Sequence, residues 1–251
     1  MNEATEKNTV VRTFPITDND VDFRKRYDVC SLMRHFHSVA DDHAYMLGVD
    51  ATTIWNAYSA IWVISRIRVD MTRMPEWHGS VRVETWPMPP GIVRMDREAT
   101  FSDESGEFAR LSSEWCVLDK ATGKPRRPAQ AGYPVDMPHR SERGAGEYER
   151  FAPVYDPSDA LFDHTVRVSD LDMNVHMNNV AYLRLACDAF SVRETERMRI
   201  RSFEIIFKAQ SFEGDRLTVC RKDEDGRTYV SAFKSDGTRV FDVAFDIDRA
   251  A

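Results

Sequence analysis

The pattern of apolar and polar positions in the first half of the chain predicts one long helix followed by several strands. Over residues 31–48, apolar side chains recur at helical spacing, and Gly48 is suited to end the helix. Extended segments are expected before it, at 10–17 and 22–27. Alternating polarity, bounded by glycine and proline, predicts four strands after it, over residues 59–70, 79–86, 92–102 and 108–118.

The second half repeats this order of elements. A strand is expected over residues 162–168, and one helix over residues 178–197. The buried face of that helix is predicted to carry Val180, Leu183, Ala186, Cys187 and Phe190. Four further strands are predicted over residues 201–208, 216–221, 227–234 and 238–246, with turns at glycine between them.

This repetition indicates a tandem duplication. A helix that buries an apolar stripe against a curved antiparallel sheet is an α+β solution, and two such units can form a pseudo-dimer within one chain. Residues 40–44 also resemble residues 186–190, at an offset of 146. Because proline and glycine are dense over 124–159, we predict three parts. These are an N-terminal domain over residues 1–130, a linker over 131–159 and a C-terminal domain over 160–251.

Composition and charge remove several classes of function. With 42% hydrophobic and 30% charged residues, the chain has the composition of a folded globular protein. No apolar run is long enough to span a bilayer, and the N-terminal residues are too polar for a signal peptide, so a cytoplasmic protein is expected. The net charge of −7 argues against a nucleic-acid binder.

Metal and cofactor sites are not expected either. The four cysteines are widely spaced and form no CxxC pair. His35 and His37 would point to different sides of the first helix, and His43 lies two turns beyond His35, so they cannot bind one metal ion together.

The densest polar cluster lies between the first strand and the helix of the second half. It reads Asp170-Leu-Asp-Met-Asn-Val-His-Met-Asn-Asn179. Asp172, Asn174 and His176 alternate with apolar residues, so an extended or turning backbone would bring them to one face. The simpler interpretation is a solvated loop that starts a helix, but such a loop has no need of this alternation.

These residue types suit acyl transfer. Asp172 can act as a base for water or attack directly, His176 can orient it or carry a proton, and Asn174 can hold a carboxylate or water. Asn178 or Asn179 can cap the helix. Free N–H groups at Asn178, Asn179 and Val180 can bind substrate by holding the oxyanion that forms at a thioester carbonyl.

At this point the chain resembles a known family. Residues 172–182 read Asp-Met-Asn-Val-His-Met-Asn-Asn-Val-Ala-Tyr. They resemble the D-x-N-x-H-x-N-N-x-x-Y stretch of acyl–acyl carrier protein thioesterases, which are tandem hotdog-fold hydrolases of bacteria and plant plastids. In the first half, that family's W-v-l-s-r, P-x-w and v-x-T-W-p segments resemble Trp62-Val-Ile-Ser-Arg66, Pro75-Glu-Trp77 and Val83-Glu-Thr-Trp-Pro87.

The resemblance implies two tandem hotdog units, each a long helix wrapped by a curved antiparallel sheet, with Asp172, Asn174 and His176 as catalytic residues. The family also carries a glutamate, often followed by cysteine, on the strand after the second helix. In this sequence Gln210 stands at the glutamate position and Ser211 at the cysteine position. Because glutamine cannot take up a proton, Gln210 could only position water or hydrogen-bond to Asp172.

The first half is expected to lack this chemistry. At an offset of 146, Asp28 and Cys30 would correspond to Asn174 and His176. The first helix is then expected to line an acyl pocket, although ordinary core is the alternative for each of its apolar residues. The residues assigned to the pocket are Leu32, Phe36 and Val39.

The activity implied is hydrolysis of fatty acyl thioesters, foremost those of acyl carrier protein in fatty acid biosynthesis. Acyl carrier protein is acidic, so an acidic chain needs a local basic patch to bind it. Candidate patches are Arg24–Arg26, Arg126–Arg127 and Arg193–Arg201. An acyl-CoA thioesterase and a non-hydrolytic acyl-binding protein are the alternatives. Monomer and homodimer are both compatible with the duplication.

Overall fold

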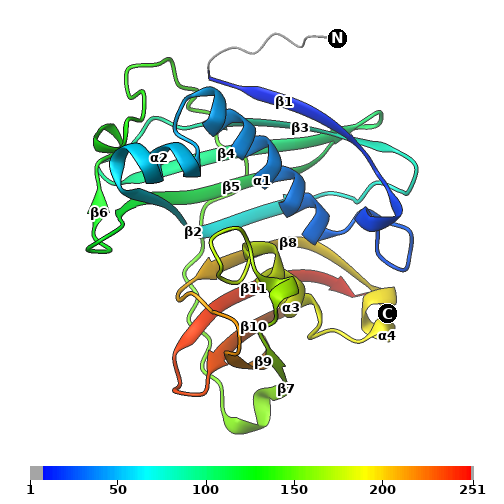
Figure 1. Ribbon diagram of the computed structural model, residues 1–251. Coiled ribbons are helices and arrows are strands. Elements are labelled where there is room, and N and C mark those ends of the chain that lie inside the picture. Colours follow the sequence, from blue (N-terminus) through cyan, green and yellow to red (C-terminus); the bar gives the residue numbers. More distant parts are fainter. Residues whose placement is uncertain (1–7, 250–251) are drawn as a thin grey trace. The chain divides into compact units, whose positions relative to one another are not determined.

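A long helix and an antiparallel sheet make up most of the first unit of the computed structural model (Figure 1). The structure describes residues 8–249, so the ends of the expected domains, 1–7 and 250–251, lie outside it. The chain divides after Gly146 into two units. In the first, the sheet order is β1-β3-β4-β5-β2, with β6 paired to β5. Its elements are β1 (Val10–Pro15), α1 (Val29–Met46), α2 (Ala51–Tyr58), β2 (Ala60–Met71), β3 (Ser80–Pro87), β4 (Arg94–Asp103), β5 (Gly106–Asp119) and β6 (Pro125–Arg126).

Local hydrogen bonds set both ends of α1. Asp28 accepts a hydrogen bond from the Ser31 N–H (2.7 Å) at the N-terminus. At the other end, Gly48 adopts a φ of 69°, a left-handed conformation that costs glycine little. The predicted helix is therefore confirmed, with each end two residues earlier than expected.

The hydrophobic pattern gave no prediction for α2, the short second helix. Asp50 caps it by accepting hydrogen bonds from the N–H groups of Thr52 and Thr53 (3.0 and 3.1 Å). An aspartate just before a helix is an N-cap signal, so this residue could have indicated the element.

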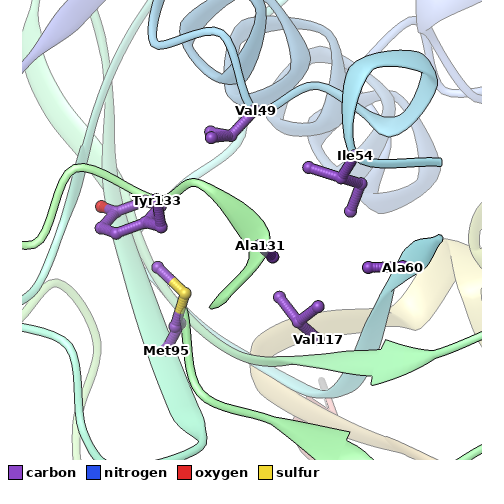
Figure 2. Packing of buried hydrophobic residues seen from close by; sticks show 7 residues of the cluster. All are labelled: Val49, Ile54, Ala60, Met95, Val117, Ala131 and Tyr133. Carbon is purple, nitrogen blue, oxygen red and sulfur yellow. The ribbon is translucent and has the colours of Figure 1, made fainter. Parts of the chain in front are cut away.

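Figure 2 shows the apolar cluster that holds α2 against the sheet. It brings together α2, the start of β2, β4, β5 and a segment after β6. Two of its members, Ala131 and Tyr133, come from the stretch expected to be a linker, yet both are buried. The cluster consists of Val49, Ile54, Ala60, Met95, Val117, Ala131 and Tyr133.

The second unit repeats the plan with a shorter helix on its sheet. The strand order is β8-β11-β10-β9-β7. Read from its other end, this is the order of the first unit with each strand replaced by its counterpart. Its elements are β7 (Ala160–Thr165), α3 (Asn179–Cys187), α4 (Val192–Arg197), β8 (Met198–Phe207), β9 (Arg216–Glu224), β10 (Arg227–Lys234) and β11 (Arg239–Arg249).

The prediction of one helix over residues 178–197 is wrong, because the helix stops at Cys187 and α4 starts afresh. Ser191 and Glu194 form a capping box in which each side chain accepts a hydrogen bond from the other's backbone N–H. Between the helices, Phe190 packs edge-on against Phe245, with ring centroids 5.4 Å apart. Local capping and this aromatic contact therefore outweigh helix continuation.

The α+β prediction of two tandem hotdog units is confirmed, since each unit contains a strand, a helix and a run of antiparallel strands. The pairing of the units as a pseudo-dimer stays a prediction. None of the helices between residues 8 and 249 is both long and apolar enough to cross a membrane.

Candidate active site

Residues 170–178, the site loop, form a tight hairpin between β7 and α3. The Asp172 N–H donates to the His176 carbonyl (2.9 Å), and the Val175 N–H donates to the Asp172 carbonyl (3.0 Å). The turn closes at Val175, whose φ of 63° is uncommon for a β-branched residue. The polar residues therefore lie on a closed turn rather than on an extended strand.

The hairpin brings together two of the four side chains predicted to be catalytic, which are those of Asp172, Asn174, His176 and Gln210. His176 Nδ1 lies 3.3 Å from Asp172 Oδ2, and the two side chains are 25% and 20% exposed. The other carboxylate oxygen, Oδ1, accepts a hydrogen bond from the Asn174 N–H (2.8 Å). Asn174 thus contacts Asp172 through its backbone, and its side chain is exposed.

Of the two predicted caps, Asn178 is the one that caps α3. Its Oδ1 accepts a hydrogen bond from the Val180 N–H (2.8 Å), and its own N–H donates to the Asp170 carbonyl (2.8 Å). Of the amides at residues 178–180, only that of Asn179 has no acceptor within the part of the chain that the structure describes. Asn179 is therefore the amide available to an oxyanion.

The segment after β8 meets the site loop at Ser211, whose carbonyl accepts the Met177 N–H (2.8 Å). Gln210 precedes this contact and its side chain is exposed. Among residues 8–249, no hydrogen bond joins Gln210 to Asp172 directly. Ser211 itself is fully buried, so its side chain is closed to substrate.

Tyr182, on α3, holds this segment in place and was missed as a functional residue. Its Oη accepts a hydrogen bond from the Ser211 N–H (2.9 Å), while its ring packs against Phe207 and Phe241. Tyr182 is the last residue of the 172–182 motif, which is the signal that could have pointed to it.

Asp170 supports the other end of the loop. One carboxylate oxygen accepts the Arg167 N–H (2.9 Å) and lies 2.9 Å from His164 Nε2. Since the Asp170 carbonyl also binds the Asn178 N–H, this residue ties β7, the site loop and the start of α3 together.

The first unit contains a second copy of the loop, at residues 20–28. The Asp22 N–H donates to the Arg26 carbonyl, and the Lys25 N–H to the Asp22 carbonyl, each at 2.8 Å. Lys25 has a φ of 59°, as Val175 has 63°. The strand expected over 22–27 is therefore a turn.

These matching hydrogen bonds set the offset between the units at 150 residues, and the predicted offset of 146 is wrong. Short helical resemblances can shift by one turn without changing the buried face, whereas a closed turn has one register. Asp28 and Cys30 do not correspond to Asn174 and His176. Instead, the counterparts of Asp172, Asn174 and His176 are Asp22, Arg24 and Arg26.

The residues assigned to an acyl pocket on α1, Leu32, Phe36 and Val39, are each fully buried in packed core. Nearby, α1 also faces polar groups. Arg97 of β4 lies with NH1 3.1 Å from His43 Nδ1, and burial lowers the pKa of Arg97 to about 10. Burial likewise lowers the pKa of His37 to about 4.

Within the described residues, no group of three or more His, Cys, Asp or Glu side chains is arranged to hold a metal ion.

Comparison with known proteins links this geometry to a family. Residues 7–130 match the Acyl-ACP thioesterase N-terminal domain, and residues 157–241 match the Acyl-ACP thioesterase C-terminal domain. The chain is 26% identical over 211 residues to a chloroplastic palmitoyl-acyl carrier protein thioesterase of Arabidopsis thaliana. A protein of the same description from Gossypium hirsutum is 29% identical over 196 residues. These alignments cover 79% and 68% of this chain, but 51% and 45% of the relatives.

Two solved structures share the fold over nearly their whole length. An acyl-ACP thioesterase from Bacteroides thetaiotaomicron superimposes with a TM-score of 0.84 at 24% identity, covering 96% of this chain and 98% of that one. The 12:0-ACP thioesterase from Umbellularia californica gives a TM-score of 0.86 at 20% identity, covering 98% and 99%. The chain belongs to the acyl-ACP thioesterase family.

Proposed function

We propose that this chain hydrolyses fatty acyl thioesters at the site loop of the second unit. The observation that carries the proposal is the Asp172–His176 pair, 3.3 Å apart and partly exposed, beside the first turn of α3. A carboxylate next to an imidazole and a free helix amide has the groups needed to activate water and hold an oxyanion.

In the proposed reaction, Asp172 takes a proton from water while the water oxygen attacks the thioester carbonyl carbon. The Asn179 N–H donates to the resulting oxyanion. The C–S bond then breaks, and the proton passes to the departing sulfur, giving a fatty acid and a thiol. Direct attack by Asp172 is the variant of this scheme in which water enters in a second step. His176 orients the carboxylate in both.

The proposed substrate is a fatty acyl group on acyl carrier protein, as in fatty acid biosynthesis. It is supported by the family and by relatives described as palmitoyl-acyl carrier protein thioesterases. The chain spans about half the length of the curated relatives it matches. That this chain shares the substrates of those longer relatives is therefore part of the proposal.

The remaining assignments belong to the same proposal. Gln210 positions the attacking water, Asn178 and Val180 order the start of α3, and the N-terminal domain holds the acyl chain near α1. We also propose a cytoplasmic location. A bacterial relative of known structure supports it, while the plant relatives are chloroplastic. Cell fractionation of the native host tests the location directly.

The decisive experiment measures fatty acid release from a panel of acyl–carrier thioesters of increasing chain length. Wild type is expected to turn over, and Asp172→Ala to lose at least 10³-fold in kcat, as expected when a base or nucleophile is removed. Asp172→Asn, which keeps the shape of the side chain, should lose activity similarly.

Parallel assays with acyl-CoA thioesters separate the alternatives. Equal kcat/KM on both carriers would favour an acyl-CoA thioesterase. Binding of acyl chains without hydrolysis of any thioester would favour a binding protein, the alternative raised by glutamine at position 210.

A further inference from the structure

We propose that the site-loop copy in the first unit is a docking surface for the acidic face of acyl carrier protein. The surface, called the basic patch, comprises Phe23, Lys25 and Arg26 on the loop, with Trp77 and His78 on the adjoining segment. The inference rests on the proposed function, because it takes the carrier-bound thioester as substrate.

The patch presents two cations that no carboxylate neutralises. Lys25 and Arg26 are exposed, and within residues 8–249 neither the Lys25 ammonium nor the Arg26 guanidinium forms an ion pair with a carboxylate. Asp22 reaches Arg26 at its backbone, where Oδ1 accepts a hydrogen bond from the Arg26 N–H (3.4 Å). Glu76, on the adjoining segment, contacts Arg26 through a backbone bridge only. Asp22 is already paired with Arg24, with 2.6 Å between Arg24 NH2 and Asp22 Oδ2.

The other basic clusters are only partly paired. Arg127, and Arg193 and Arg197 on α4, are exposed, whereas the other three arginines of these clusters lie beside carboxylates. Arg199 pairs with Asp248 and Arg201 with Asp246, at 2.6 and 2.7 Å. In the Arg126–Arg127 cluster, Arg126 lies 3.7 Å from Asp119. Exposed ion pairs of this kind leave little net field for an incoming acidic protein.

The patch is also held rigidly. Lys25 Nζ lies 6.0 Å from the ring centroid of Trp77, and the Trp77 N–H donates to the Lys25 carbonyl (3.0 Å). Trp77 stacks on His78 with ring centroids 4.1 Å apart. A preordered surface loses less entropy on binding, which favours its use as an interface.

The strained backbone of the loop also supports a role for it in docking. Lys25 and His78 have φ values of 59° and 70°, which are unfavourable for residues other than glycine. The first unit keeps this strained hairpin although arginine replaces the asparagine and histidine of the site loop. Retained strain without the site's chemistry indicates another role. Phe23, which is 54% exposed, adds an apolar contact beside the cations.

Charge complementarity selects the occupant. The chain carries a net charge of −7, so an acidic protein is repelled overall and must approach through a local positive surface. Electrostatic steering of this kind acts mainly on association and weakens as salt rises.

The test compares wild type with the double variant Lys25→Glu/Arg26→Glu on two thioesters of the same acyl group. One is carried by acyl carrier protein and the other by N-acetylcysteamine, which has no charge and no protein surface. We expect KM for the carrier thioester to rise at least tenfold, with kcat/KM for the small thioester unchanged. The wild-type KM for the carrier thioester should also rise between 20 and 200 mM salt, and the variant's should respond less.

The matched control is Arg193→Glu/Arg197→Glu, which reverses two exposed cations on α4. It should leave both substrates within twofold of wild type. An unchanged carrier KM in the loop variant, or an equal loss in the α4 variant, overturns the docking proposal. Equal loss on both thioesters in the loop variant also overturns it. A wild-type protein that hydrolyses neither thioester instead contradicts the proposed function.

Discussion

The two oxygens of Asp172 face different partners, and in the proposed reaction this division leaves one oxygen to take a proton from water. Oδ1 is held by the Asn174 N–H at 2.8 Å, which fixes the orientation of the carboxylate. Oδ2 faces His176 at 3.3 Å, a distance long enough for the pair to adjust when water or substrate enters. Gln210 is the other residue at which this chemistry can be tested by substitution.

Gln210→Glu is expected to raise kcat on the preferred acyl–carrier thioester by about tenfold or more. A glutamate can share the proton taken from water, which glutamine cannot, and a positioned base contributes about 10²–10⁴ in rate. Steady-state kinetics measure the effect. Gln210→Ala should lower kcat instead, and a glutamate variant no faster than the alanine variant would show that this position does not reach the reacting water.

Tyr182→Phe is expected to lower the free energy of unfolding by about 1–3 kcal/mol, because the Ser211 N–H would lose its acceptor inside the protein. Urea unfolding measures the change. Ser211→Ala is the matched control at the same junction. It keeps the Ser211 N–H and its acceptor, so it should cost less stability than Tyr182→Phe. The reverse ranking would refute the role given to Tyr182.

At the scale of elements, each unit has a tight hairpin followed directly by a capped helix. Asp28 caps α1 and Asn178 caps α3 at equivalent positions after equivalent turns. The cap in the second unit also determines which amide is left free, since Asn178 Oδ1 occupies the N–H of Val180. The helix start therefore contributes to stability and to the proposed oxyanion site together.

Asn178→Ala is expected to destabilise the protein by about 1 kcal/mol and to lower kcat more than it raises KM, since the cap orders the Asn179 amide. Asn178→Asp keeps an oxygen acceptor and should recover the stability. Thermal unfolding and steady-state kinetics on the same samples provide both readouts. If the aspartate variant is as unstable as the alanine variant, the cap is not the source of the loss.

At the scale of the whole molecule, the stretch of chain where the first unit ends and the second begins makes polar contacts within each unit. On the first unit, the Gly144 N–H donates to Glu98 Oε2 (2.7 Å) and the Ala145 N–H to Ser112 Oγ (3.0 Å). On the second, the Glu149 N–H donates to Glu204 Oε2 (3.0 Å). Both acceptor carboxylates are buried, so this connection is fastened at both ends.

Gly144→Ala is expected to release the first of these attachments. An added Cβ would lie 2.3 Å from the Leu111 carbonyl oxygen, a backbone atom that cannot move aside. We expect a loss of about 1–3 kcal/mol and faster protease cleavage between residues 140 and 150. Ser141→Ala, at an exposed position of the same segment, is the control. The protease should cleave it at the same rate as wild type.

Stability is expected to fall on acidification partly through His37. Burial lowers the pKa of His37 from 6.5 to about 4, so the folded protein disfavours the protonated ring. The stabilising contribution is complete above pH 6.5 and is lost as the pH falls toward 4, by about 3 kcal/mol at most. Urea unfolding from pH 7 to 4.5 should show a shallower decline in His37→Gln, whereas His78→Gln should follow wild type.

Much of the fold could be predicted from the sequence, because the spacing of apolar residues follows which face of a helix or strand is buried. The strand over residues 227–234 matches β10 at both ends, and α1 is displaced by two residues. Two of the misses, α2 and the break before α4, follow from capping by Asp50 and Ser191. Such caps act through single hydrogen bonds and leave no hydrophobic period.

Spacing along the chain was enough to predict the long first helix, most of the strands, the duplication and the motif from Asp172 to Tyr182. Tertiary structure decided the register of the two loops, the single free amide at Asn179 and the availability of Lys25 and Arg26. These depend on which hydrogen bonds and ion pairs form between residues that periodicity does not relate. Only the folded chain brings those partners within a few ångströms of each other.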